Sequence, residues 1–432
     1  MFAWLVALLG ACSTPSPPGP PQTVVLVVMD TVRADHTSLC GHDRPTTPRL
    51  DALAARRGAV HACRAYSPAP WTHPSHASLL TGAPVEEHGA VWTSEGTKVS
   101  PWMAVRPLAE EAVTLPEELA AAGYQTALVS ANPVLAQDGG LLQGFEQVRV
   151  AARPLELRGE RFPPVLAEVL DAVDAERPLL LVVNLYDAHD PYPGTDGSLP
   201  WGGRAPAVML VDLNGRITST FRGFIGGTLH PDTEEAFLLS VRDGYDAGIH
   251  AADANLGAVL DALQARGRLA DARVVVTSDH GELLGEHRLL RHGGFLWEEV
   301  ERVPVVAWDS RRPLPALPEP LAGRAVHALL RDGRLPDLPV TAVSDNPGNV
   351  EVGVVGGALW EGTRKGVVAD GRVVVTDLAR DPREIAGMEA LEGDAMVAPL
   401  RALAERVEAV RAEGVPERKG LGEALRAVGY VE

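Results

Sequence analysis

Four runs of apolar, mostly β-branched residues recur along the chain, and helix-like segments separate them. The runs cover Thr23–Met29, Thr126–Ser130, Pro178–Leu185 and Arg273–Thr277. The helical patterns cover Pro48–Arg57, Pro74–Leu80, Leu115–Ala122, Phe162–Ala175 and about Glu234–Arg266. Continuous apolar strands that alternate with helices are typical of a mostly parallel sheet covered by helices on both faces. The pattern therefore predicts an α/β fold of this kind.

The chain changes character after Trp308. A Pro-rich connection, "RRPLPALPEPLAG", leads into short strand patterns and a helical end. These cover Glu351–Val355, Gly366–Val368, Arg372–Val375 and about Met396–Glu413. We expect three parts: a leader and tether over residues 1–22, a catalytic domain over 23–310, and a linker with a small α+β subdomain over 311–432.

Polar side chains follow the end of each predicted strand. In chain order they are Asp30; Asn132; Asp187, His189 and Asp190; and Asp279, His280 and Glu282. Open α/β sheets bind ligands outside the carboxyl ends of their strands. The sequence therefore predicts that these side chains converge on one site.

Composition narrows the class of protein. The chain has 432 residues, of which 46% are hydrophobic, so it can bury a large core. Its net charge of −18 argues against a general nucleic-acid partner, which would require basic patches. It does not exclude small anionic substrates, because a bound metal ion can reverse the local field.

The N-terminus has the pattern of a secreted bacterial lipoprotein. An apolar run from Phe2 to Leu9 is followed by "GAC", which resembles a lipoprotein cleavage box with Cys12 as the lipidated residue. No Lys or Arg precedes the run, so a frayed apolar terminus is the alternative. The run is too short to span a bilayer, and Ser13–Gln22 is a Pro-rich tether. We therefore expect a protein of the bacterial envelope, held at the membrane by a lipid. The other two cysteines, Cys40 and Cys63, would pair only in an oxidising compartment, and the sequence leaves this open.

Several motifs, taken in order, carry a family resemblance. They are "VVLVVMDTVRADH", "RPTTPRLDALAARRG", "WTHPSHASLLTG", "DAHDPY", "YDAGIHAADANLG" and "VVVTSDHGELLGEH" with the following "HGGFLWEEVERVP". Together they resemble the sulfatase family of the alkaline phosphatase superfamily, from about Thr23 to Pro304. A weaker echo lies at "TDLARDPRE".

The resemblance implies a metal centre and a nucleophile. Asp30, Asp279 and His280 match the family's metal ligands, and Thr72 matches the nucleophile, which also binds the metal. Oxygen ligands with one imidazole suit one divalent ion, such as Ca²⁺, Mg²⁺, Mn²⁺ or Zn²⁺. A simple helix N-cap is the alternative role for Thr72.

The resemblance also implies residues around the substrate. His189 and His292 correspond to catalytic positions beside the transferring group. We expect His76, Asn132 and Asp187 to bind substrate. His292 and Asp187 could alternatively hold a second metal ion.

Departures from the family pattern change the expected substrate. Sulfatases carry a Cys or Ser, converted to formylglycine, where this chain has Thr72. A Thr would give a ketone on oxidation, because its Cβ carries a methyl group. The family's Arg is replaced by His76, and the second Asp of an Asp-Asp pair by Thr31.

These differences favour a phosphoester hydrolase that acts on a small anionic ester. The alternatives are a sulfuric ester hydrolase, a transferase that moves a phospho-head group onto an envelope glycan or lipid, and an inactive binding protein on the same fold.

Overall fold

The computed structural model describes residues 21–412 except 101–102, 137–138, 154, 193, 195–198, 211–217, 346–355, 370–371, 386–387 and 391–392. Cys12, the predicted strand at Glu351–Val355 and the last residue of the predicted C-terminal helix lie outside the described residues. Within them, no helix is both long and apolar enough to cross a membrane.

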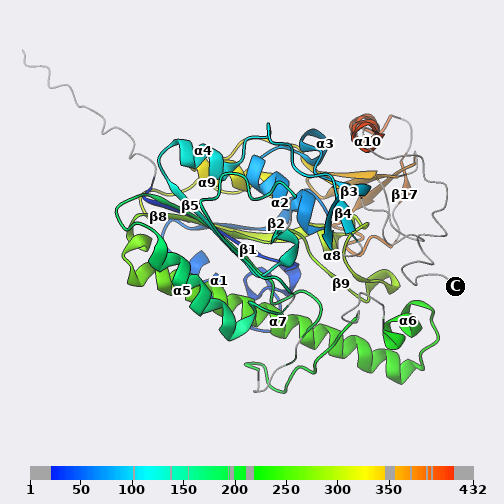
Figure 1. Ribbon diagram of the computed structural model, residues 1–432. Helices are drawn as coiled ribbons and strands as arrows, with labels where there is room; N and C mark the ends of the chain where they lie inside the picture. The colour runs from blue at the N-terminus through cyan, green and yellow to red at the C-terminus, as the bar shows by residue number, and fades with distance from the viewer. Residues whose placement is uncertain are drawn as a thin grey trace, which may run out of the picture.

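An eight-stranded sheet forms the centre of the molecule (Figure 1). Its order is β12-β2-β11-β8-β1-β7-β5-β6. Only β11 runs antiparallel to its neighbours, so the predicted mostly parallel sheet is confirmed. The strands are β1 (Thr23–Met29), β2 (Val60–Tyr66), β5 (Gln125–Ser130), β6 (Gln147–Val150), β7 (Leu179–Leu185), β8 (Ala272–Thr277), β11 (Arg302–Asp309) and β12 (Leu321–Ala322).

Helices cover both faces of this sheet (Figure 1). One face packs against α1 (Pro48–Ala54), α5 (Phe162–Ala172) and α7 (Pro231–Ala265), and the other against α2 (Thr72–Thr81), α4 (Leu115–Ala121) and α9 (Val326–Asp332). Alternate residues of β1 enter the two cores: Val25 and Val27 face the first group of helices, and Val24 and Leu26 face the second. Burial on both faces is why the predicted strands read as continuous apolar runs.

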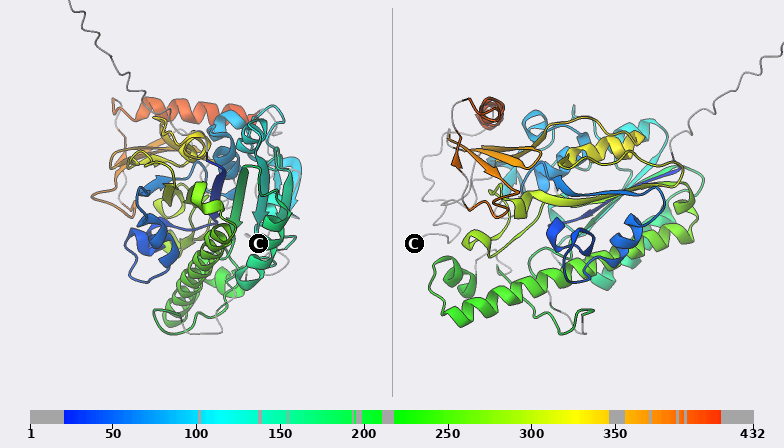
Figure 2. Two further views of the ribbon diagram at one scale, coloured as in Figure 1. Left: turned by 90° about the vertical axis from the view of Figure 1, so that its left-hand side faces the viewer. Right: turned by 180° about the vertical axis from the view of Figure 1, so that it is seen from behind.

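Shorter elements surround the carboxyl ends of the strands. They are α3 (Val85–His88), β3 (Trp92–Ser100), β4 (Met103–Val105), α6 (Ser219–Ile225), β9 (Leu283–Leu284), β10 (Leu290–Arg291) and α8 (Glu298–Glu301). The N-terminal part of α7 extends past the sheet, where it lies beside α6 (Figure 2).

A second, antiparallel sheet forms the predicted C-terminal subdomain. Its strands are β13 (Val340–Ser344), β14 (Gly356–Glu361), β15 (Arg364–Ala369), β16 (Arg372–Asp377) and β17 (Met388–Glu389). The helix α10 (Val397–Ala412) packs on one face of this sheet. The other face meets the main domain, where Trp360 stacks on Tyr66 with ring centroids 4.3 Å apart.

The main sheet extends beyond residue 310, the predicted end of the catalytic domain. Residues 321–322 add β12 to its edge, and α9 packs on the same face as α2 and α4. The Pro-rich stretch therefore returns the chain to the main sheet before the second sheet begins. The sequence did not indicate β12 and α9, because a Pro-rich stretch is typical of an extended linker between domains.

Candidate active site

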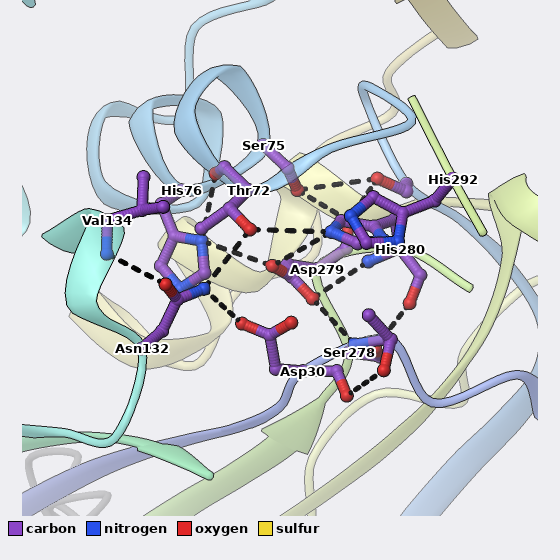
Figure 3. Close-up of polar contacts among 12 residues, drawn as sticks. Asp30, Thr72, Ser75, His76, Asn132, Val134, Ser278, Asp279, His280 and His292 are labelled. Carbon is purple, nitrogen blue, oxygen red and sulfur yellow. Dashed lines mark hydrogen bonds and ion pairs between the residues drawn. The ribbon is translucent and has the colours of Figure 1, made fainter. Parts of the chain in front are cut away.

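Four predicted ligands meet at the carboxyl ends of β1 and β8 (Figure 3). Asp30 follows β1, Asp279 and His280 follow β8, and Thr72 opens α2. One potential ligand atom from each of Asp30, Asp279 and His280 lies within 4.8 Å of the others. The structure thus brings together three of the side chains that the sequence analysis expected to converge, and their role as metal ligands stays a prediction.

Thr72 projects its hydroxyl into the cluster instead of capping the helix. The N-cap of α2 is Trp71, and no side chain caps this helix. The Thr72 Oγ1 atom accepts a hydrogen bond from Asn132 Nδ2 at 3.2 Å and lies 3.5 Å from His280 Nε2. The N-cap alternative is therefore wrong, and the hydroxyl lies among the predicted metal ligands (Figure 3).

Asn132 and Asn184 fix the orientation of the Asp30 carboxylate. Both amide nitrogens donate to Asp30 Oδ2, at 2.7 Å and 3.0 Å. The backbone N–H of Val134 donates to Asn132 Oδ1, which turns the Asn132 nitrogen toward the site. The other oxygen, Asp30 Oδ1, is buried and has no hydrogen-bond partner. A buried carboxylate oxygen without a partner is costly unless a cation satisfies it.

Asp279 shows the same division between its two oxygens. The backbone N–H groups of Thr31 and His280 donate to Asp279 Oδ1, at 3.2 Å and 3.1 Å. The atom Asp279 Oδ2 is buried without a hydrogen-bond partner. Burial, and next the nearby Asp279 carboxylate, raise the pKa of Asp30 above its usual range. Two buried carboxyl groups this close are stabilised either by protonation of one of them or by a cation between them.

The donor set fits a divalent cation. His280 Nδ1 lies 2.9 Å from the carbonyl oxygen of Gly281, so a neutral ring donates there and leaves the lone pair of Nε2 free. That lone pair, the two carboxylate oxygens without a hydrogen-bond partner and Thr72 Oγ1 make an oxygen-rich site with one imidazole, and Asp279 Oδ2 lies 3.4 Å from His280 Nε2 and 3.5 Å from His76 Nδ1. Such a set suits a hard or borderline ion.

The backbone beside Asp30 is strained. Thr31 has φ of 63°, a left-handed conformation that is unfavourable for a β-branched residue. The Tyr245 hydroxyl donates to the Thr31 carbonyl at 2.6 Å, and Thr31 Oγ1 donates to the Asp30 carbonyl at 2.6 Å. Strain of this kind persists where surrounding contacts hold it, and here it directs the Thr31 N–H at Asp279.

Serine hydroxyls hold the loop after β8. Ser67 and Ser75 both donate to the Asp279 carbonyl oxygen, the latter at 2.7 Å. Ser278 donates to the His280 carbonyl oxygen at 2.6 Å. Ser75 lies one turn after Thr72 in α2. The same helix therefore positions the candidate nucleophile and holds the backbone of Asp279, the predicted metal ligand that follows β8.

His76 is part of the framework around Thr72. Its Nδ1 lies 3.0 Å from the Thr72 carbonyl oxygen, and its Nε2 lies 3.3 Å from Asn184 Nδ2. Burial lowers the pKa of His76 to about 4, so the ring is neutral at pH 7. Both nitrogens have protein partners, and direct contact between His76 and substrate stays a prediction.

His292 and His189 extend the site away from the metal ligands. The ring centroid of His292 lies 4.2 Å from that of His280 and 5.0 Å from that of His189. Glu282 Oε1 lies 3.0 Å from His292 Nδ1 and sets the orientation of that ring. Burial lowers the pKa of His189 well below its usual value. Its Nδ1 contacts the Asp190 carbonyl, so Nε2 of the neutral ring can accept a proton.

Asp187 has a different environment from the one expected. Its Oδ1 accepts from the backbone N–H of Gly159 at 2.6 Å, and its Oδ2 from Asn255 at 3.3 Å. In the described part of the chain, neither Asp187 nor His292 belongs to a group of three potential metal ligands. The roles of Asp187 in substrate binding and in a second metal site stay predictions.

Two buried residues of this region were not identified from the sequence. Asn184, in β7, orients Asp30, and its only signal was a polar residue inside an apolar strand. Arg158 donates to the carbonyl oxygens of His189 and Pro191, at 2.8 Å and 2.7 Å. Its guanidinium carbon lies 4.5 Å from the ring centroid of Tyr186. Arg158 is far from these residues in sequence and matches no motif.

The family and the fold together identify an ester hydrolase, and comparisons with known proteins give the family. The sulfatase family model matches residues 22–330. An arylsulfatase of Clostridium perfringens (strain 13 / Type A) is 22% identical over 340 residues, which cover 66% of this chain and 68% of that protein. The chain belongs to the sulfatase family, whose members generally use a divalent metal ion.

Solved structures share the fold at low sequence identity. A phosphonate monoester hydrolase of Agrobacterium radiobacter aligns with a TM-score of 0.63 and 19% identity, over 91% of this chain and 96% of that one. A protein solved with its substrate D-glucosamine-2-N,6-O-disulfate aligns with a TM-score of 0.65 and 16% identity, over 93% and 100%. The fold is therefore shared by proteins named for different ester substrates.

Proposed function

We propose that this protein hydrolyses phosphoric esters through Thr72, with one divalent cation held by Asp30, Asp279, His280 and the Thr72 hydroxyl. The observation that carries the proposal is the position of the Thr72 hydroxyl. It caps no helix and lies beside His280, in the cluster where Asp30 and Asp279 each have a buried carboxylate oxygen without a hydrogen-bond partner. The Thr72 methyl group prevents formation of the aldehyde that the family uses for sulfate esters. A Thr alkoxide can still attack phosphorus directly.

In the first half of the reaction, Thr72 forms a covalent ester. A bound divalent cation would lower the pKa of the Thr72 hydroxyl and withdraw charge from the substrate's non-bridging oxygens. The hydroxyl proton leaves to solvent, and Oγ1 forms a bond to phosphorus while Asn132 donates a hydrogen bond to Oγ1. The bond between phosphorus and the leaving oxygen breaks, its electron pair stays on that oxygen, and the oxygen takes up a proton from solvent.

In the second half, water cleaves the phosphothreonine. The free Nε2 of His189 accepts a proton from the attacking water, whose oxygen bonds to phosphorus. The bond between phosphorus and Oγ1 breaks, its electron pair stays on Oγ1, Oγ1 takes up a proton from solvent, and His189 releases its proton to solvent. The contacts of Glu282 with His292 and of Arg158 with the His189 carbonyl keep both imidazoles in place during these steps.

The substrate is proposed to be a small anionic ester, such as one on an envelope glycan or lipid. Assays of aryl phosphate mono- and diesters and of an aryl sulfate, each with Ca²⁺, Mg²⁺, Mn²⁺ or Zn²⁺, test the proposal. We expect kcat/KM for the better phosphoester to exceed that for the sulfate by at least about tenfold, or about 1.4 kcal/mol. Preference for the sulfate by the unmodified protein would favour the sulfatase alternative. Activity of Thr72→Val supplies the background.

We also propose that the protein works outside the cytoplasm, tethered through Cys12. The pairing of Cys40 with Cys63 supports this location, because disulfides persist in oxidising compartments. Cys12→Ser should shift the protein from the membrane fraction to the soluble fraction, or leave an unprocessed precursor. Immunoblots of fractionated cells, compared with Cys63→Ser, measure this shift. If Cys12→Ser fractionates as the wild type does, the anchor is excluded.

A further inference from the structure

We propose that His36, His42 and Asp246 form a second metal site, separate from the catalytic centre, for a transition-metal cation such as Zn²⁺, Co²⁺ or Ni²⁺. His36 ends the short helix η1 (Ala34–His36), His42 follows η2 (Ser38–Cys40), and Asp246 lies in α7. The blue segment that carries η1 and η2 lies beside α7 in both views of Figure 2.

The three side chains present their ligand atoms to one point. His36 Nδ1 lies 2.7 Å from Asp246 Oδ1, and His42 Nε2 lies 3.1 Å from Asp246 Oδ2. One ligand atom from each residue lies within 4.8 Å of the other two. A cation bonded at about 2.0–2.2 Å to such atoms requires only a small change in their separation.

The three proposed ligands differ in solvent exposure, and this difference would allow a cation to enter from solvent. The side chain of Asp246 is 2% exposed, and those of His36 and His42 are 13% and 19% exposed. The carboxylate is therefore fixed, and the imidazoles form the entry. Two imidazoles and one carboxylate favour zinc-like ions, whereas calcium and magnesium prefer oxygen ligands. The site therefore differs in selectivity from the oxygen-rich cluster at Thr72.

Arg44 competes with a cation for Asp246. Its Nη1 contacts Asp246 Oδ2 at 2.8 Å, and its Nη2 contacts Asp243 at 2.7 Å. The Arg44 side chain is 29% exposed, so it can leave Asp246 and keep its pair with Asp243. The two states of the cluster are therefore an ion pair with Arg44 and a metal complex without that contact.

The site would connect the loop after β1 to α7 beside the catalytic centre. The His36 ring packs edge-on against Tyr245, with centroids 5.2 Å apart. The Tyr245 hydroxyl accepts from the Arg33 N–H at 2.9 Å and donates to the Thr31 carbonyl. A cation at His36 and His42 would thus stabilise the segment that follows Asp30 without contacting substrate.

Cobalt titration of the full-length protein tests the site. The protein is first saturated with Mg²⁺ or Ca²⁺, and Co²⁺ binding is then followed by calorimetry, visible absorption and elemental analysis. We expect the wild type to bind one equivalent more than His42→Gln. Co²⁺ should also raise the Tm of the wild type but not of this variant, since a ligand that binds only the folded state stabilises it. His61→Gln removes an exposed histidine of β2 and should bind as the wild type does.

A second variant tests the site independently of the folding of His42→Gln. Arg44→Met removes the competing guanidinium and should tighten Co²⁺ binding by at least about two- to fivefold, the range expected even for a solvent-exposed ion pair. Equal cobalt stoichiometry in the wild type and His42→Gln overturns the proposal. So does unchanged or weaker binding by Arg44→Met, because a cluster that is only an ion pair gains no metal affinity when Arg44 is removed.

Discussion

Thr72→Val should abolish turnover of every ester that the enzyme accepts. The substitution removes the hydroxyl and keeps the side-chain volume at a position that is 5% exposed. Loss of a covalent nucleophile lowers kcat by at least about 10⁴-fold. The fold should persist, because the side chain caps no helix and the hydrogen bond that its hydroxyl accepts from Asn132 is worth about 1 kcal/mol. Steady-state kinetics and thermal unfolding measure the two effects.

Thr72→Ser is the matched variant for this result. It keeps the hydroxyl and loses only a methyl group, so partial activity should survive. A serine phosphoester trapped by acid quench and identified by mass spectrometry would place the covalent step at this residue. Wild-type rates in Thr72→Val, or equal loss in Val and Ser variants with metal bound, would contradict a nucleophilic role.

The core of the fold could be predicted because its strands are buried on both faces. In β1 and β7 every residue is buried, which gives continuous apolar runs with recognisable ends. Strand β2 and the edge strand β6 are only partly buried, and the other edge strand, β12, has two residues, so none of them gave a clear pattern. Strand β11 is apolar, but its antiparallel direction depends on pairing with distant residues.

The position of the strand ends also decided which residues of the candidate site could be predicted from the sequence. Asp30, Asp279 and His280 stand where strands end, so topology alone brings them together. Asn184 faces Asp30 from within a strand, and Arg158 contacts the backbone of another loop, so only the tertiary structure reveals their roles. Asp187 also follows a strand, yet its carboxylate bonds to Gly159 and Asn255, because position after a strand does not fix side-chain direction.

Removal of the catalytic metal should eliminate turnover and destabilise the wild type. Without a cation, the partnerless oxygens of Asp30 and Asp279 leave two buried like charges together. Asp279→Asn removes one charge and can keep the amide oxygen on the N–H groups of Thr31 and His280. We therefore expect the metal-free variant to be at least as stable as the metal-free wild type, although it is inactive.

The stability of the metal-free wild type should fall as pH rises. The pKa of Asp30 is raised in the folded protein, so its contribution to stability is present at low pH and is lost as pH rises through the folded pKa. Burial also raises the pKa of Glu282 and of Asp253, so the slope for the wild type has several sources. The difference between wild type and Asp279→Asn isolates the carboxylate pair.

Thermal unfolding of both proteins in chelator, from pH 5 to pH 8, measures that difference. The wild type should lose more stability than the variant as pH rises, and added Mg²⁺ or Ca²⁺, which the His36–His42–Asp246 site disfavours, should restore only the wild type. Parallel pH profiles, or a metal-dependent gain in Tm as large in Asp279→Asn as in the wild type, would show that Asp279 does not share a cation with Asp30. Because Thr72→Val keeps both carboxylates, it should still gain Tm with metal, which separates metal binding from the chemistry at Thr72.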